Sequence, residues 1–218
     1  MPLTIDVVSD VVCPWCFVGK RKLAAALDLY AKERPEAPAP AVTWRPFQLN
    51  PQMPAEGMPR SDYVQRKFGR SGTEVYARVS QAGKSVGIDF AFDKIQRQPN
   101  TLVPHALIAL AAEHGKQDEV VDAFFHAYFL EGRDLTDPAT LSEVAVVAGL
   151  PQDAVAACLA DEAARRAVAQ EDEQAREIGV SGVPFFIFNG RYAVSGAHDP
   201  ETLLQAILQA ESATADPA

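Results

Sequence analysis

The sequence lacks a membrane-length apolar run: no stretch approaches the roughly 18 uninterrupted apolar residues that a spanning helix needs. It also lacks a basic stripe, and its net charge is -9 at pH 7. Its longest positive run, Lys20, Arg21 and Lys22, is interpreted as the solvated face of a helix. Phosphate binding needs clustered lysine and arginine. The sequence therefore disfavours both a membrane and a nucleic acid as partners.

A secretory signal is also missing, because residues 1–5 have neither a basic region nor a long apolar core. We therefore expect a cytoplasmic protein, in a compartment that keeps thiols reduced. Three cysteines is an odd number, which fits a working thiol pair better than a disulfide framework. Cys13 and Cys16 have no second Cys-x-x-Cys and no paired histidines at ligand spacing, so no metal site is expected.

Hydrophobic periodicity predicts strand, helix and strand at the start, a long helical block, and a hairpin with a helix at the end. The first strand is predicted at 4–9, the helix at 16–33 and the second strand at 42–46. Asn189-Gly190 predicts a tight turn between strands at 185–188 and 192–194. We divide the chain into four parts. Residues 1–58 are predicted to form the first half of the core, and 59–178 a helical insertion. Residues 179–211 are predicted to form the second half of the core, and 212–218 a disordered tail.

Cys13 and Cys16 stand two residues apart, directly after the first strand and at the start of the predicted helix. Pro14 falls in the first helical turn, where its missing N–H costs nothing. Free N–H groups and the helix dipole at this end stabilise an anion, so Cys13 is predicted to be the nucleophilic thiolate. Cys16, one turn inside, is predicted to be the resolving thiol. Half of a zinc site and an inert pair are the alternatives.

Val183-Pro184 is the second feature, because a flexible segment at 179–182 precedes it and an apolar strand follows. Proline is tolerated at the first residue of a strand, so an ordinary trans proline is one interpretation. The other is a cis bond that turns the Val183 backbone outward toward an extended peptide or a thiol ligand.

Together these stretches carry a resemblance that spans nearly the whole chain. Residues 9–20 (SDVVCPWCFVGK) are similar to the active-site stretch of the DsbA-like thioredoxin superfamily, in its FrnE-like branch. Residues 179–186 (GVSGVPFF) resemble that family's cis-proline loop, and 194–197 resemble its stretch before the last helix. The resemblance implies an α/β fold: a thioredoxin-like core with a large all-helical insertion. It also implies a protein disulfide oxidoreductase with Cys13 as the exposed nucleophile, Cys16 as the resolver and Pro184 in cis.

The same fold branch includes 2-hydroxychromene-2-carboxylate isomerases and kappa-class glutathione transferases, which this chain resembles around Asn100, Thr101 and His105. Those proteins typically carry serine where Cys13 stands and lack the second cysteine, so a redox role is favoured here. A glutathione-dependent isomerase or transferase remains one alternative, and a non-catalytic, peptide-binding or chaperone-like module the other. The expected partners are protein or small-molecule thiols and disulfides. No cofactor is required, glutathione is a candidate co-substrate, and both monomer and homodimer stay open.

Other residues carry weaker expectations. Pro14 and Trp15 lie between the cysteines, and Trp15 offers a flat apolar contact to a substrate. Asp10 lies three residues before Cys13 and is either a proton relay or a turn residue. His105 follows the helix cap expected at Thr101, and it either faces the thiol cleft and contacts substrate or packs elsewhere. Cys158 shares an apolar helix face and is expected to be a buried, inert thiol.

Overall fold

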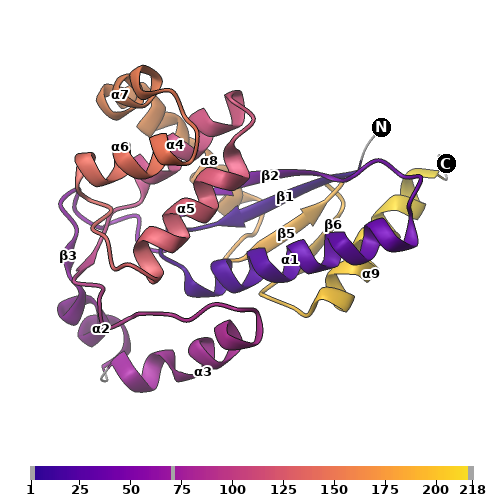
Figure 1. Cartoon of the computed structure of the whole chain (residues 1–218), viewed down its shortest axis with the longest axis horizontal. Helices are drawn as coiled ribbons and strands as arrows, with labels where there is room; N and C mark the ends of the chain where they lie inside the picture. The colour runs from indigo at the N-terminus through magenta and orange to yellow at the C-terminus, as the bar shows by residue number, and fades with distance from the viewer. Residues whose placement is uncertain (1–2, 70–71, 216–218) are drawn as a thin grey trace.

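The computed structural model describes residues 3–69 and 72–215 and has a mixed α/β fold (Figure 1). Its main sheet has four strands in the order β2-β1-β5-β6. Strands β1 (Thr4–Ser9) and β2 (Ala41–Pro46) run parallel. Strand β5 (Phe185–Phe188) lies antiparallel to β1, and β6 (Tyr192–Ser195) is antiparallel to β5. The segments predicted as strands therefore form one sheet.

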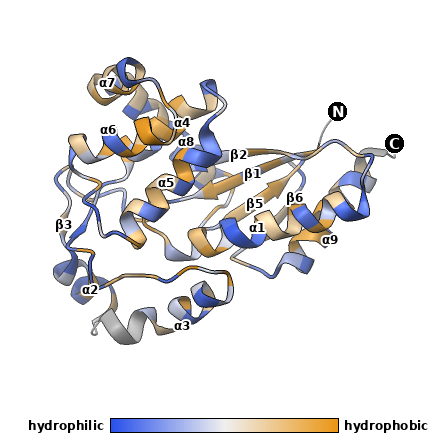
Figure 2. Ribbon diagram, viewed as in Figure 1, coloured by the Kyte–Doolittle hydropathy of each residue, from blue (hydrophilic) through white to orange (hydrophobic). Residues whose placement is uncertain are grey.

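The sheet separates two apolar layers because successive side chains along a strand point to opposite faces. Ile5 packs in the larger cluster with α1 (Pro14–Glu33) and α9 (Pro200–Ala215). Val8 packs in a smaller cluster on the other face, which α8 (Glu162–Glu177) covers. Figure 1 shows α1 and α9 side by side along the sheet, and Figure 2 shows the hydrophobic strands behind them. Burial on both faces explains why β1 and β5 read as nearly continuous apolar runs.

The helical block lies beyond the end of the sheet toward which β1 points (Figure 1). Before α8 it contains α2 (Arg60–Phe68), α3 (Gly72–Ser85), α4 (Leu102–Glu113), α5 (Gln117–Phe129), α6 (Pro138–Val147) and α7 (Gln152–Ala160). Phe17 of α1 stacks on Phe125 of α5 with ring centroids 5.1 Å apart, and one hydrophobic cluster runs through both parts. The block therefore packs onto the core. Its predicted limits at 59 and 178 stay a prediction.

Three details of the block differ from the sequence-based expectation. Two-residue strands β3 (Met58–Pro59) and β4 (Arg97–Gln98) pair antiparallel, and such short strands leave no periodicity to detect. The last part of the long helical block is broken at Asp161, between α7 and α8, where the Asp161 carboxylate accepts the Ala163 N–H at 2.7 Å. Thr101 occupies the predicted cap of α4, but the capping bond comes from Asn100, whose Oδ1 accepts the Leu102 N–H at 2.9 Å.

The C-terminal part also differs in two places. Asn189 and Gly190 form the predicted turn with positive φ values of 50° and 65°. Phe188 pairs with Tyr192, so Arg191 joins Asn189 and Gly190 in a three-residue connection, whereas an Asn-Gly pair is typical of a two-residue one. The tail was predicted to be disordered from residue 212, yet α9 continues to Ala215 and residues 216–218 lie outside the described part. Ala210 of α9 still packs on the core, and the Ser212 hydroxyl donates to the Leu208 carbonyl at 3.1 Å within the helix.

The positive run on α1 is not the solvated face that the sequence suggested. Lys20 is 7% exposed, and its Nζ lies 2.6 Å from Asp118 Oδ2 of α5. Lys22 pairs with Asp199, just before α9, at 2.6 Å. The partners lie roughly a hundred residues or more along the chain, so local sequence could not identify them. These ion pairs join α1 to both its neighbours.

Candidate redox site

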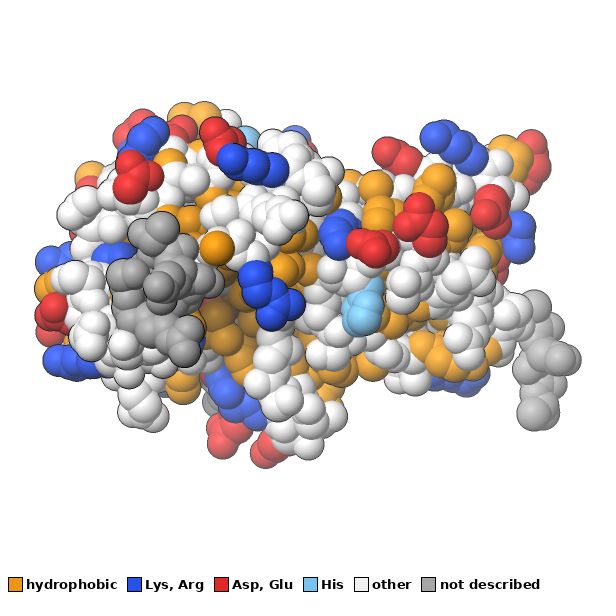
Figure 3. All heavy atoms as spheres, turned by 90° about the horizontal axis from the view of Figure 1, so that it is seen from below, with side chains coloured by type: hydrophobic (Ala, Val, Ile, Leu, Met, Phe, Trp, Pro, Cys, Tyr) orange, Lys and Arg blue, Asp and Glu red, His pale blue; other side chains and the backbone are white. Residues whose placement is uncertain are grey.

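Three segments meet at one end of the sheet. Because β1 and β2 are parallel and β5 is antiparallel to them, the ends of β1 and β2 and the start of β5 lie at the same edge. The turn at 10–13 follows β1, the loop at 47–50 follows β2, and Val183-Pro184 precedes β5. Figure 3 shows a hollow lined by hydrophobic side chains on the face that carries the α2–α3 segment. The topology therefore brings the two predicted motifs to one edge.

The two cysteines lie at the N-terminal end of α1, as predicted. Cys13 is the N-cap residue, with φ -94° and ψ 109°, and Pro14 is the first helical residue. The Cys16 N–H donates to the Cys13 carbonyl at 3.0 Å, which sets the second cysteine one turn inside. Both thiols are free. The Cys13 thiol donates to the Val183 carbonyl at 3.5 Å across 170 residues of sequence.

Cys13 is not the exposed residue that the resemblance implied, because only 4% of it is accessible. The segment before β5 covers it through the contact with Val183. Trp15 is 37% exposed and is the residue of the motif that the surface presents, as expected. The Cys13 sulfur is therefore covered by the segment before β5, whereas Trp15 is open to solvent.

Cys16 is buried, with 1% of its surface accessible. Burial raises the pKa of its thiol well above the ordinary value, and the neighbouring Cys13 thiol raises it further by hydrogen bonding and charge. Bonds from the Asp10 main chain and the Ser9 hydroxyl act in the opposite direction. Cys16 is therefore held as a protonated thiol at neutral pH, which suits a group that acts second.

Pro184 packs closely on α1. The Val183–Pro184 peptide bond is cis, and Pro184 is buried. A Cβ atom added at Gly19 would lie 2.9 Å from Pro184 Cγ and 3.3 Å from Phe186 Cζ. Only glycine leaves room for this approach, since real Cβ atoms essentially never come within 3.0 Å of another heavy atom. Gly19 was not identified from the sequence, because a glycine within a helix gives no sign of a partner so distant in the chain.

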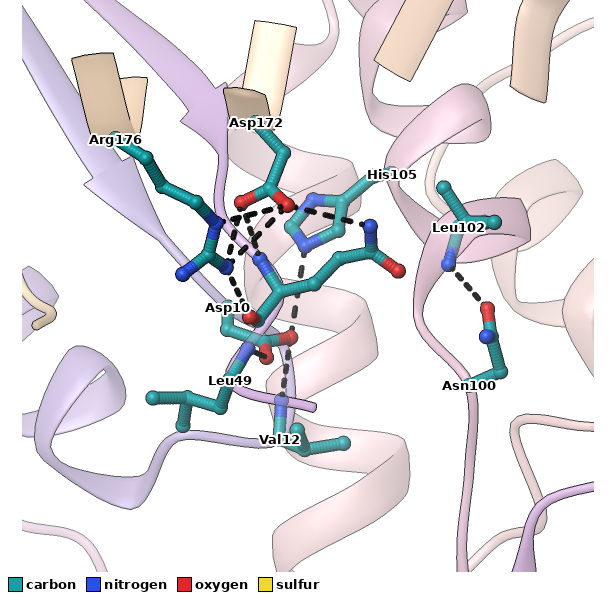
Figure 4. Close-up of polar contacts among 9 residues, drawn as sticks. Asp10, Val12, Leu49, Asn100, Leu102, His105, Asp172 and Arg176 are labelled. Carbon is teal, nitrogen blue, oxygen red and sulfur yellow. Dashed lines mark hydrogen bonds and ion pairs between the residues drawn. The ribbon is translucent and has the colours of Figure 1, made fainter. Parts of the chain in front are cut away.

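Asp10, whose carbonyl accepts the Cys13 N–H, forms a buried pair with His105 (Figure 4). Asp10 is fully buried; its carboxylate accepts the Leu49 N–H at 2.8 Å and the Val12 N–H at 3.5 Å. His105 Nε2 lies 3.5 Å from Asp10 Oδ1, and His105 is only 4% exposed. Of the two interpretations of His105, packing inside the protein agrees with this geometry, because α4 turns its side chain inward onto Asp10. The main-chain bonds agree with the turn interpretation of Asp10.

A second polar group, not identified from the sequence, holds the neighbouring loop (Figure 4). The Asp172 carboxylate on α8 accepts the Gln48 N–H at 2.9 Å, and Arg176 donates to the Gln48 carbonyl at 2.5 Å. Arg176 also pairs with Asp172 at 3.0 Å and lies over the Phe47 ring at 4.1 Å. The spacing of Asp172 and Arg176 is typical of a surface pair. Their shared partner, Gln48, lies 124 residues from Asp172 and 128 residues from Arg176, so no local sequence pattern could point to it.

Other predicted features lie away from this site. Cys158 on α7 is half-buried, whereas a fully buried thiol was expected. Burial raises the pKa of this thiol most, and the negative charge of Asp161 raises it further. The described residues hold no cluster of three or more histidine, cysteine, aspartate or glutamate side chains that could bind a metal. Within the same part of the chain, no helix is long and apolar enough to cross a bilayer.

The fold and the thiol pair define a thioredoxin-fold protein of the DsbA-like class. The chain belongs to the family of DSBA-like thioredoxin domains, whose model matches residues 4–208. It is 32% identical to the probable DsbA oxidoreductase SCO1869 from Streptomyces coelicolor; the match covers 96% of this chain and 90% of that one, with a TM-score of 0.85.

Two further relatives are more distant. The chain is 26% identical over 208 residues to the uncharacterized protein YwbO of Bacillus subtilis (strain 168). This match covers 95% of this chain and 96% of YwbO. It shares the fold of the cytosolic disulfide reductase DsbM from Pseudomonas aeruginosa, with 21% identity, a TM-score of 0.64, and coverage of 96% of this chain and 95% of DsbM. The α/β fold with a thioredoxin-like core is thus the one that the sequence predicted.

Proposed function

We propose that the protein is a thiol–disulfide oxidoreductase in which Cys13 attacks and Cys16 resolves. The observation that carries this proposal is the pair itself: two free thiols at the start of α1, of which Cys13 is hydrogen-bonded to the Val183 carbonyl and Cys16 is buried. The loss of either thiol, as in the serine-bearing relatives of the resemblance, would remove the exchange chemistry. Membership of the DSBA-like family supports the same class of activity.

The reaction runs in two balanced steps. The Cys13 thiolate attacks one sulfur of a substrate disulfide; that S–S bond breaks, a Cys13–substrate disulfide forms, and the other substrate sulfur leaves and takes up a proton. Cys16 then loses its proton and attacks Cys13 Sγ, which releases the second substrate thiol and leaves a Cys13–Cys16 disulfide. Two electrons pass from the protein to the substrate. Oxidation of a substrate dithiol follows the same steps in reverse.

The surrounding residues have assigned roles in this scheme. Trp15 and the Val183 backbone flank the path to Cys13, with Pro14 and Pro184 shaping it on either side. Asp10 supports the ionisation of Cys16, because its main chain bonds to that thiol and acts against the burial that raises the pKa. A relay of the Cys16 proton by the Asp10 carboxylate stays a prediction. His105 has no substrate contact in this scheme, since it is buried against Asp10.

The protein is proposed to act in the cytosol, as DsbM is described to do, and to reduce or isomerise disulfides there. A reducing compartment returns Cys13 and Cys16 to the dithiol form, which favours reduction over the installation of disulfides. Glutathione is the proposed electron donor, since DsbM has also been solved with GSH.

Insulin reduction tests the proposal. The wild type is expected to reduce insulin, Cys13→Ser to lose all activity, and Cys16→Ser to accumulate a mixed disulfide seen by mass spectrometry. Activity that survives Cys13→Ser would refute the redox function. A glutathione redox titration of the wild type should give one intramolecular Cys13–Cys16 disulfide; its absence would rule out the resolving role of Cys16.

A further inference from the structure

A cavity of about 460 Å³ lies next to the redox site, between the loop that follows β2 and helix α2. Leu49 lines it, and the Leu49 N–H is bound by Asp10, whose carbonyl accepts the Cys13 N–H at 2.9 Å. Leu49 and Val183 also pack against the same hydrophobic cluster. One wall of the cavity thus belongs to the loop that supports the cysteine turn. Its volume falls in the range of ligand pockets.

The inner side of the cavity is apolar and firmly held. Met53 and Met58 line it, and Met53 packs with Tyr63 in a small hydrophobic cluster. Asn100 donates to the Met53 carbonyl at 2.7 Å, which fixes the loop to the segment before α4. Methionine side chains are flexible and polarisable, so they adapt to apolar groups of different shape. This side is suited to an apolar side chain.

The outer side of the cavity is cationic. Arg66 and Lys67 of α2 line it and are exposed. Lys67 Nζ donates to the Tyr63 hydroxyl at 2.7 Å. Within residues 3–69 and 72–215, neither Arg66 nor Lys67 makes an ion pair, whereas Lys20 and Lys22 of α1 do. In a chain of net charge -9, two unpaired cations on one cavity favour an anionic occupant.

We propose that this cavity binds an acidic stretch of a protein substrate, with an apolar side chain against Met53 and Met58 and carboxylates at Arg66 and Lys67. The inference rests on the proposed function, because it places the rest of the substrate while its disulfide meets Cys13. A ligand that spans both places must pass the Leu49 loop. An extended segment of an unfolded protein, which advances about 3.3 Å per residue, can pass this loop within a few residues.

Binding of a cysteine-free peptide tests the inference independently of redox activity. The probe is a fluorescein-labelled decapeptide with leucine beside two glutamates, and its partner has lysines in place of the glutamates. Fluorescence anisotropy would compare wild type, Arg66→Glu/Lys67→Glu, and the control Lys32→Glu/Arg191→Glu. The control makes the same charge change at exposed positions on the last turn of α1 and in the β5–β6 turn. Thermal unfolding would check that all three proteins fold.

The wild type and the control are expected to bind the acidic peptide at least about fivefold more tightly than the site variant, as two exposed ion pairs allow. Added salt should reduce the difference. A leucine-to-serine change in the peptide should weaken binding to the wild type several-fold and have a smaller effect on Met58→Ala. Equal affinity of the wild type and the site variant, or equal binding of the lysine peptide, would overturn the inference.

Reduction of 2-hydroxyethyl disulfide, a small neutral substrate, separates this inference from the proposed function. All three proteins should reduce it at the same rate, because the cavity holds none of its atoms. If the wild type binds the acidic peptide selectively but does not reduce the small disulfide, the proposed function fails and the binding site stands. If all three reduce it and none prefers the acidic peptide, only the binding site fails.

Discussion

The contact between α8 and the loop after β2 gives a quantitative prediction for Asp172→Ala. Asp172 is 4% exposed, and its carboxylate accepts the Gln48 N–H at 2.9 Å and pairs with Arg176 at 3.0 Å. The substitution leaves the buried Gln48 N–H without its partner. A hydrogen bond to a charged group contributes about 1.5–3 kcal/mol. The Arg176 side chain is 39% exposed, so solvent limits the ion pair to at most about 1 kcal/mol.

Together these losses predict that Asp172→Ala lowers the free energy of unfolding by about 3 kcal/mol. Urea unfolding at pH 7 measures it: the midpoint should fall by roughly 1 M if the urea dependence is near the upper end of the usual range. Glu173→Ala is the matched control, since Glu173 is the next residue on α8, carries the same charge and is exposed. It should change the free energy of unfolding by less than about 0.5 kcal/mol.

A double-mutant cycle with Arg176→Ala tests the assignment of the energy. Arg176 makes its own bond to the Gln48 carbonyl and lies over Phe47, so its removal should also destabilise the protein. The double mutant should lose less stability than the sum of the losses of the two single mutants, because each single substitution already removes the ion pair between the two residues. A loss below about 1 kcal/mol for Asp172→Ala, or strict additivity in the cycle, would refute the reasoning.

Three further predictions concern the site. Gly19→Ala should lower both stability and insulin reduction, because overpacking against Pro184 costs about 1–3 kcal/mol. Gly182→Ala is the control, since nothing lies within 4 Å of its added Cβ. Equal urea midpoints of the two variants would contradict the close approach of Gly19 to Pro184. Burial raises the pKa of Cys16, so the folded state holds this proton more tightly than the unfolded state. The contribution of this thiol to stability is therefore fully present below the ordinary thiol pKa of about 8.5 and is lost as the pH rises above it. Between pH 8 and 10, the free energy of unfolding of Cys16→Ala should fall less than that of the wild type. Parallel pH dependences of the two proteins would argue against a buried thiol. Trp15→Ala should leave the urea midpoint unchanged and raise KM for insulin, since the side chain is 37% exposed; an unchanged KM would remove Trp15 from the substrate path.

The elements of the fold could be read from local sequence because each has a strong local cause. β1 is an apolar run that ends at the cysteine turn, and Pro14 fixes the start of α1. Asn189 and Gly190 supply the two positive φ values of the last turn. The helical block was found from its apolar periodicity, but its short strands β3 and β4 have too few residues for any period.

The candidate site was only partly predictable. Its thiol pair is a local motif, whereas its partners come from contacts across the chain. The resemblance of 179–186 to a known loop joined Pro184 to the cysteines, and no pattern of spacing would have done so. The burial of Cys13 depends on Val183, and the inward turn of His105 depends on how α4 packs. The role of Asp172 depends on Gln48, 124 residues earlier. Such long-range contacts follow from packing and leave no local signal.

The 170 residues between Cys13 and Val183 have a consequence for biosynthesis. β1 and β5 are neighbours in the sheet, but a ribosome that adds about 5–20 residues per second makes the second of them roughly 10–30 seconds after the first. During that interval the emerging chain carries Cys13 and Cys16 without the segment that covers them. The newly made thiols are then open to any oxidant or disulfide nearby. Selective access to this site begins only when the last sixth of the chain has joined the sheet.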